Sequence, residues 1–63
     1  MEKGTVKFFN EEKGYGFITQ DETNVELFVH KSNTKEKLLE NDKVRFVIEQ
    51  GDRGEFAAKV EII

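Results

Sequence analysis

The sequence contains no cysteine and only one histidine, so neither disulfide bonds nor a cluster of metal ligands can stabilise this chain. No apolar run approaches the length of a membrane span or of the hydrophobic region of a signal peptide. We therefore expect no membrane association and a cytoplasmic location, which the absence of cysteine also favours. Linkers and repeats are absent as well, which predicts one domain over residues 1–63. Its stability must come from a small apolar core.

Basic charge is also scarce, because the net charge is −3. This balance argues against a nucleic-acid partner, since affinity for phosphate normally requires a basic surface. The acids are unevenly distributed, however. Residues 1–20 contain three acids and three bases, whereas residues 21–63 contain ten acids and seven bases. The excess of acid therefore lies outside the N-terminal third of the chain.

Alternation of apolar and polar residues predicts five short strands separated by turn-rich sequences. Their expected bounds are Lys3–Asn10, Tyr15–Gln20, Val25–His30, Lys43–Gln50 and Phe56–Ile62. Five strands in 63 residues favour an all-β fold built as a small closed barrel. The inward-facing residues are expected to be Val6, Phe9, Ile18, Val25, Leu27, Val29, Val44, Phe46, Ile48, Ala58, Val60 and Ile62.

The first strand needs a departure from regular strand geometry. Phe8 and Phe9 are adjacent and cannot share one face, so we assign Phe9 to the core and Phe8 to the surface. This assignment requires a β-bulge near Lys7.

In the stretch 31–41, Thr34 is a candidate cap for a short helical turn over residues 35–39, and Leu38 is expected to anchor this segment to the barrel.

Aromatic residues occupy strand faces that usually carry polar side chains. In the segment KGYGFI, Tyr15 and Phe17 share the face opposite to Ile18. In the segment LFVH, Phe28 and His30 lie opposite to the buried positions. Rings clustered on the outside of a sheet indicate a ligand, and an unpaired nucleobase can stack on a flat π-face. The pattern therefore predicts a surface for single-stranded nucleic acid.

Four segments occur in a fixed order: GTVKFFN at 4–10, KGYGFI at 13–18, LFVH at 27–30 and GDRG at 51–54, the last followed by Ala57 and Ala58. In this order and spacing they resemble the bacterial cold-shock proteins and the cold-shock domain over nearly the whole chain. The resemblance implies a five-stranded antiparallel OB-type barrel that binds single-stranded RNA and DNA and acts as an RNA chaperone. It implies no catalysis.

The chain departs from that family at three places. Lys31 stands where the family usually has an aromatic residue after the histidine. The stretch 31–41 is shorter than usual and lacks a further aromatic residue. Glu55 and Phe56 replace the usual Pro-Gln before the two alanines. The stacking surface is therefore expected to be reduced on one side.

These patterns define the expected interface. Bases are expected to stack on Phe8, Tyr15, Phe17, Phe28 and His30, and phosphates to contact Lys7, Lys13 and Arg53. Lys31 and Phe56 are secondary candidates. Lys31 can attract phosphate without stacking, and the strand parity of Phe56 slightly favours the core over the ligand. No metal or cofactor is expected, because His30 has no partner ligands.

We therefore expect a non-enzymatic protein that binds single-stranded, pyrimidine-rich RNA and DNA. One alternative is a protein-interaction barrel, which the net acidity favours. Another is a diverged or engineered cold-shock-like barrel with weakened nucleic-acid binding, which Lys31 and the short stretch after it favour. We expect a monomer, with a strand-exchanged dimer as the alternative. An enzyme is disfavoured because the chain offers no activated nucleophile and no metal set.

Overall fold

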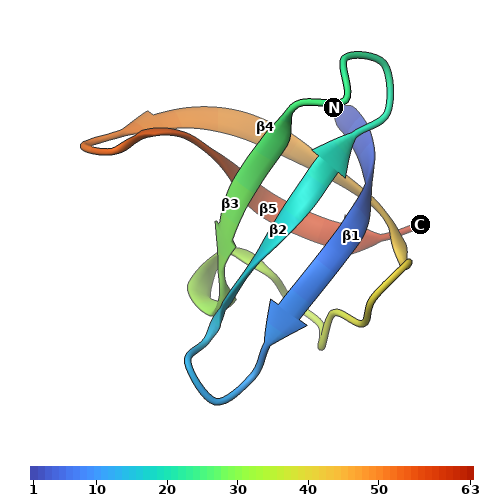
Figure 1. Cartoon of the computed structure of the whole chain (residues 1–63), viewed down its shortest axis with the longest axis vertical. Coiled ribbons are helices and arrows are strands. Elements are labelled where there is room, and N and C mark those ends of the chain that lie inside the picture. The colour runs from blue at the N-terminus through green and yellow to red at the C-terminus, as the bar shows by residue number, and fades with distance from the viewer.

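Five strands and one short 3-10 helix form the fold, and the computed structural model describes all of residues 1–63. The elements are β1 (Glu2–Asn10), β2 (Tyr15–Gln20), β3 (Glu26–His30), η1 (Lys31–Asn33), β4 (Lys43–Gly51) and β5 (Gly54–Ile62). Figure 1 shows β1, β2 and β3 side by side, with the long β4–β5 hairpin crossing behind them. No helix has the length and apolarity that a membrane crossing requires. All five predicted strands are present, with small differences at their ends.

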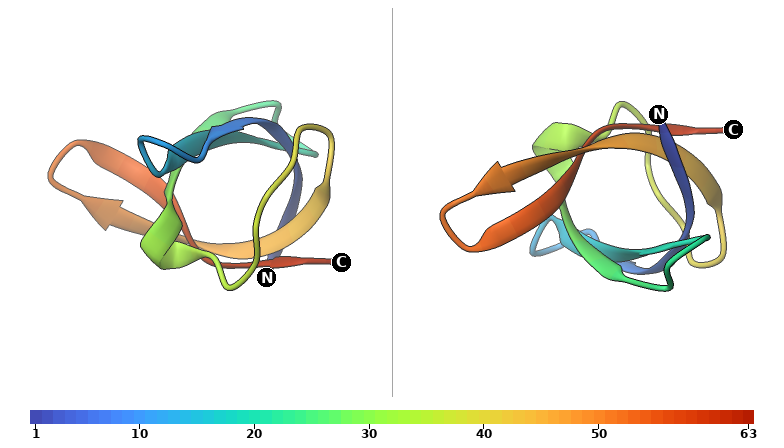
Figure 2. Two further views of the ribbon diagram at one scale, coloured as in Figure 1. Left: turned by 90° about the horizontal axis from the view of Figure 1, so that it is seen from below. Right: turned by 90° about the horizontal axis from the view of Figure 1, so that it is seen from above.

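The strands close into a barrel in the order β1-β2-β3-β5-β4, and the ring is visible from either end in Figure 2. Four neighbouring pairs are antiparallel, whereas β3 and β5 pair in parallel at Phe28 and Phe56. A closed ring with an odd number of strands cannot alternate direction throughout, so one pair must be parallel. The predicted five-stranded OB-type barrel is confirmed, and this parallel seam is its one departure from antiparallel pairing.

The barrel interior is filled by one apolar cluster. Its nine buried members are Val6, Ile18, Leu27, Val29, Leu38, Val44, Phe46, Ala57 and Val60. Phe9, Ile48 and Ile62 pack against this cluster from partly buried positions, in agreement with their predicted inward orientation. The anchoring role of Leu38 is confirmed, since its side chain is 1% exposed. No buried side-chain nitrogen or oxygen lacks a hydrogen-bond partner, so the core contains no unsatisfied polar group.

The predicted bulge in β1 is confirmed. Val6 pairs with Ile18, whereas Phe8 pairs with Phe17, the residue just before Ile18 in β2. Lys7 is therefore the extra residue in β1. The bulge lets Val6 point inward while Phe8 turns outward. Gly16 makes this geometry sterically feasible, because a Cβ atom there would lie only 2.8 Å from the Cα atom of Phe9.

A second bulge lies in β5 and was not predicted. Arg45 pairs with Glu61 and Val47 with Ala58, so β5 holds one residue more than β4, and Lys59 takes a φ of 53°. This bulge breaks the strict alternation of β5, and both Ala57 and Ala58 are buried. The parity argument that placed Phe56 in the core is therefore wrong, since Phe56 is half-buried and lies outside the core cluster.

Val25 is not part of the buried face. Its side chain is 47% exposed, and β3 begins one residue later. The reason is the turn before it, in which Asn24 takes a φ of 59° and the Val25 carbonyl accepts a hydrogen bond from the Gln20 amide. Val25 therefore belongs to the turn.

The helical turn expected over residues 35–39 is also wrong. Helical geometry occurs earlier, at η1, where the His30 side chain rather than Thr34 acts as the N-terminal cap. Thr34 is extended, with φ of −129°, and forms a parallel bridge with Val60. Backbone pairing with the barrel thus takes the place of a local turn that is too short to be stable alone.

Candidate nucleic-acid interface

Four aromatic rings meet on the outer face of β1, β2 and β3. We call Phe8, Tyr15, Phe17 and Phe28 the aromatic platform. Strand register explains why they meet, because Phe8 pairs with Phe17 and Phe17 pairs with Phe28. Ring centroids are 5.5 Å apart for Phe8 and Phe17 and 5.9 Å apart for Phe17 and Phe28. The sequence-predicted rings are thus brought into one row that crosses three strands.

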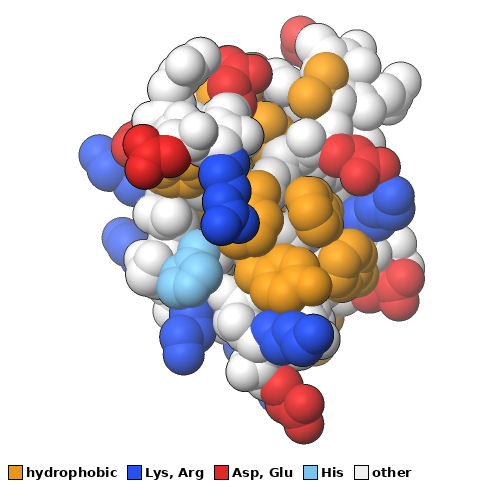
Figure 3. Space-filling view, turned by 60° about the vertical axis from the view of Figure 1, so that its left-hand side comes forward, with side chains coloured by type: hydrophobic (Ala, Val, Ile, Leu, Met, Phe, Trp, Pro, Cys, Tyr) orange, Lys and Arg blue, Asp and Glu red, His pale blue; other side chains and the backbone are white.

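Tyr15 completes the platform beside that row. Its ring is nearly parallel to that of Phe28, with centroids 5.8 Å apart and an interplanar angle of 17°. Its ring is perpendicular to that of Phe17, at 89°. Phe8 and Phe28 nevertheless remain 39% exposed. The rings therefore support each other at their edges and keep apolar surface open to a ligand, as the hydrophobic patch in Figure 3 shows.

His30 stands next to Tyr15, its partner in the β2–β3 register. The Ser32 amide donates a hydrogen bond to His30 Nδ1 at 3.2 Å, and the Ser32 hydroxyl oxygen is 2.9 Å from the same nitrogen. Because Nδ1 accepts from the backbone, the neutral ring carries its proton on Nε2. The imidazole is thus oriented by η1, and its Nε2–H is available as a donor at the edge of the platform.

Lys7 is not a free cation. Its Nζ lies 2.7 Å from Glu26 Oε2, across β2 from its own strand. Glu26 was not among the predicted site residues, although its parity in β3 places it on the same face as Phe28 and His30. An exposed ion pair of this kind is weak, but it lowers the charge that Lys7 offers to a phosphate.

Lys13, Lys31 and Arg53 form no ion pair with any carboxylate. Lys31 lies against the β1–β2 turn, where its amide donates to the Gly14 carbonyl at 2.8 Å. Its alkyl chain covers Gly14, since a Cβ atom there would be 2.8 Å from Lys31 Cδ. Figure 3 shows basic side chains around the hydrophobic patch, with the one histidine at its edge.

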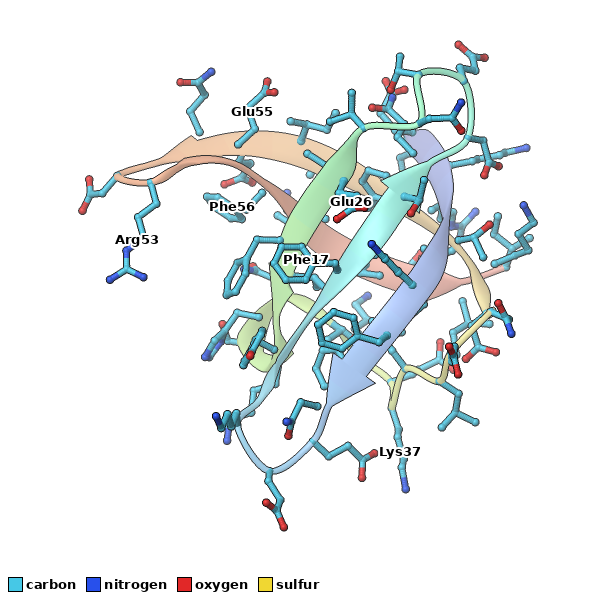
Figure 4. All side chains as sticks on the ribbon, in the orientation of Figure 1. Phe17, Glu26, Lys37, Arg53, Glu55 and Phe56 are labelled. Atoms are coloured by element: carbon cyan, nitrogen blue, oxygen red, sulfur yellow. The ribbon has the colours of Figure 1, made fainter.

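Arg53 and Phe56 lie at the other end of the platform, on the β4–β5 hairpin. Phe56 pairs with Phe28 across the parallel seam, so the row of phenylalanines continues from β3 onto β5. In Figure 4, Arg53 and Phe56 project from the same side of the hairpin ribbon, whereas Glu55 projects from the other side. The structure thus joins Phe56 to the predicted site and leaves Arg53 at its end.

The fold and the exposed aromatic row define a small OB-type barrel with a candidate surface for nucleic acid. Residues 2–63 match the sequence profile of the 'Cold-shock' DNA-binding domain. The chain is 52% identical to the cold shock-like protein CspG of Escherichia coli, over 90% of this chain and 87% of that protein. It is 45% identical to the cold shock-like protein CspA of Bordetella pertussis over the full length of both. The major cold shock protein of Micrococcus luteus is 47% identical, over 95% of this chain and 96% of that protein.

The chain therefore belongs to the cold-shock domain family, a class of nucleic-acid-binding proteins. This membership confirms the family resemblance of the sequence motifs. It also agrees with the closed five-stranded barrel that the structure shows.

Proposed function

We propose that this protein binds single-stranded RNA and DNA by stacking unpaired bases on the aromatic platform, with His30 as a further contact. The observation that carries this proposal is the cross-strand row of Phe8, Phe17 and Phe28, which stays exposed at its ends although it is highly apolar. Aromatic side chains bind bases of any sequence because every base has a π-face. A duplex hides these faces, so the platform favours single strands.

Phosphate contacts come from cations that surround the platform. Lys13, Lys31 and Arg53 are exposed and have no carboxylate partner, so each can approach a phosphate without breaking an ion pair. Lys7 can contact a phosphate only when its ion pair with Glu26 is broken. Few cations and several rings make stacking the larger part of the binding free energy.

The expected partners are pyrimidine-rich strands, because weaker stacking between their own bases leaves those bases free for the protein. Binding to unpaired RNA shifts the equilibrium of the RNA from hairpins toward unpaired strands by mass action. This shift is the action of an RNA chaperone. A hairpin RNA labelled with a fluorophore and a quencher should therefore open further as the protein is added.

Titration followed by Tyr15 fluorescence tests the central proposal. Tyr15 is the only tyrosine and the chain has no tryptophan, so its emission is not masked. We expect an oligo-dT strand to quench it and to bind more tightly than a duplex of equal length. Equal affinity for both forms would contradict base stacking, and binding of neither form would favour a protein partner for this face.

A further inference from the structure

The outer edge of β1 has no strand partner over its last residues. β2 pairs with residues 4–10 of β1, whereas β4 pairs only with residues 2–5. The segment 34–42 lies beyond the end of β4, and both of its backbone hydrogen bonds to β1 are formed with Val6. Residues 8–10 therefore have a strand neighbour on one side only, and we call them the open edge of β1. Such edges present backbone groups that another chain can pair with.

A cleft lies between the open edge and the segment 34–42, which crosses the end of the barrel in Figure 2. The cleft has a volume of about 470 Å³ and is lined by residues 8–12 on one side and residues 37–40 on the other. Four of these residues are hydrophobic, and one of them, Leu39, is 58% exposed. The cleft thus combines a free strand edge with apolar side chains, which are the two elements that an added β-strand needs.

The charges of this cleft select among its possible occupants. Glu11, Glu12 and Glu40 belong to the lining, and Lys37 is its one basic residue. Lys37 projects toward the end of the barrel that carries the β1–β2 turn (Figure 4), and its Nζ lies 3.2 Å from Glu11 Oε1. Glu12 and Glu40 form no ion pair. The uncompensated acid disfavours a phosphate backbone and also a second copy of this chain, whose net charge is −3. It favours a basic peptide.

We propose that the cleft is a docking site for an extended basic segment of a partner protein, which adds as a strand to the open edge of β1. Main-chain hydrogen bonds to the edge provide affinity, and alternate side chains provide selectivity. Apolar side chains of the segment contact Leu39, and its lysines or arginines meet Glu12 and Glu40. The cleft shares only Phe8 with the aromatic platform, so the peptide and a nucleic acid use largely separate surfaces.

Amide resonances of isotope-labelled protein locate the docking site directly. The probe is a peptide of about seven residues that alternates lysine and leucine, a length typical of a β-strand. We expect it to shift the amide resonances of residues 8–12 and 37–40, whereas oligo-dT should shift those of Phe17 and Phe28. Shifts confined to the aromatic platform, or no shifts, would overturn the docking site. Shifts of residues 8–12 and 37–40 that depend on protein concentration without peptide would assign the edge to a second copy and also overturn it.

Fluorescence anisotropy with the labelled peptide separates strand addition from general charge attraction. The same peptide with every backbone amide N-methylated keeps its charge but cannot pair with the edge, and it should bind about tenfold more weakly or less. Glu12→Gln combined with Glu40→Gln should lower the affinity for the unmodified peptide by about 2- to 30-fold. Glu22→Gln combined with Glu49→Gln removes the same charge outside the cleft, again from carboxylates without ion pairs, and should have little effect. Equal binding of both peptides, or equal effects of both double variants, would refute the proposal.

Discussion

Phe17 and Ile18 are neighbours in β2 with opposite surroundings. The Phe17 ring touches three other rings of the platform, whereas Ile18 is fully buried in the core cluster. Strand alternation alone predicts this division, because adjacent side chains leave the sheet on opposite faces. The proposed ligand binding and the packing of the core therefore depend on consecutive residues.

Alanine substitution should separate the two roles. We expect Phe17→Ala to weaken binding to oligo-dT by about 1–3 kcal/mol with a small loss of stability. Ile18→Ala should instead lower the free energy of unfolding by about 2–5 kcal/mol, because it leaves a cavity in a closely packed core. Thermal melts and binding titrations on both variants provide the measurement. A large loss of melting temperature for Phe17→Ala with unchanged binding would reverse the assignment of faces.

Individual charges were harder to predict than individual rings. The alternation of β2 and β3, together with the inferred bulge in β1, placed the rings on the surface, but no periodicity indicates that Glu26 reaches Lys7 across β2. That contact depends on the twist of the sheet and on the bulge, which are properties of the folded backbone. Phe56 illustrates the same limit, because the bulge at Lys59 shifts the alternation of β5 and no sequence pattern locates it.

At the scale of elements, the alternation of apolar and polar residues predicts the strands. The segment after η1 has no such pattern from which its structure could be predicted. Residues 34–42 cross the end of the barrel without regular structure, and tertiary contacts hold them in place. Leu38 is buried in the core cluster, and Lys37 Nζ lies 3.2 Å from Glu11 Oε1 in the β1–β2 turn. One apolar anchor could be predicted for this segment, but its path could not.

Leu38 and Leu39 allow a matched test of that anchor. Their exposed fractions are 1% and 58%. We expect Leu38→Ala to destabilise the protein by about 2–5 kcal/mol in urea unfolding. Leu39→Ala should change stability by less than about 0.5 kcal/mol, since the side chain is already in solvent. Similar losses for both variants would mean that the segment packs differently from this structure.

Glu61 on β5 forms ion pairs with two other parts of the chain. Its carboxylate lies 3.2 Å from Lys35 Nζ, in the segment after η1, and 2.9 Å from Arg45 Nη2 on β4. Hydrogen bonds from Lys35 and then from Arg45, together with their charges, hold the pKa of Glu61 below its ordinary value of 4.5. A depressed pKa stabilises the fold above pH 4.5, and that contribution is lost as the pH falls through the lowered value.

Glu61→Gln should therefore lower the melting temperature slightly at pH 7. The difference from the parent should shrink as the pH falls below 4.5, where the parent also loses the charge. Melting curves from pH 7 to pH 2.5 measure this convergence. Asp52→Asn, at a carboxylate without an ion pair, is the control, and it should show no comparable convergence. A difference between Glu61→Gln and the parent that stays constant with pH would assign the effect to packing.

At the scale of the whole molecule, net charge and local charge have different consequences. Five of the ten Lys and Arg side chains form ion pairs, and Lys13, Lys31 and Arg53 are free beside the proposed interface. About three phosphate contacts give a slope of log K against log salt of about −2 for a single strand. Binding at several salt concentrations measures that slope, and a slope several times steeper would refute a stacking-dominated mode.

Two glutamine variants refine this measurement. Lys13→Gln should make the slope shallower by about 0.7, because one phosphate contact is lost. Lys35→Gln should leave it unchanged, since that ammonium is already held by Glu61. An equal effect of both variants would show that general charge, rather than the position of each cation, sets the affinity.

The parallel seam has a consequence for how the barrel opens. Only Phe28 and Phe56 join β3 to β5, with one further bridge between Thr34 and Val60, whereas the antiparallel neighbours share longer ladders. Amide protons along this seam should therefore exchange with solvent sooner than those of the β1–β2 ladder. An open seam also exposes two strand edges to another copy of the chain. Because Phe28 belongs to both the seam and the aromatic platform, a nucleic acid bound to the platform would hold the seam closed. The ligand would therefore slow hydrogen exchange and suppress strand swapping at the place where the barrel is least securely closed.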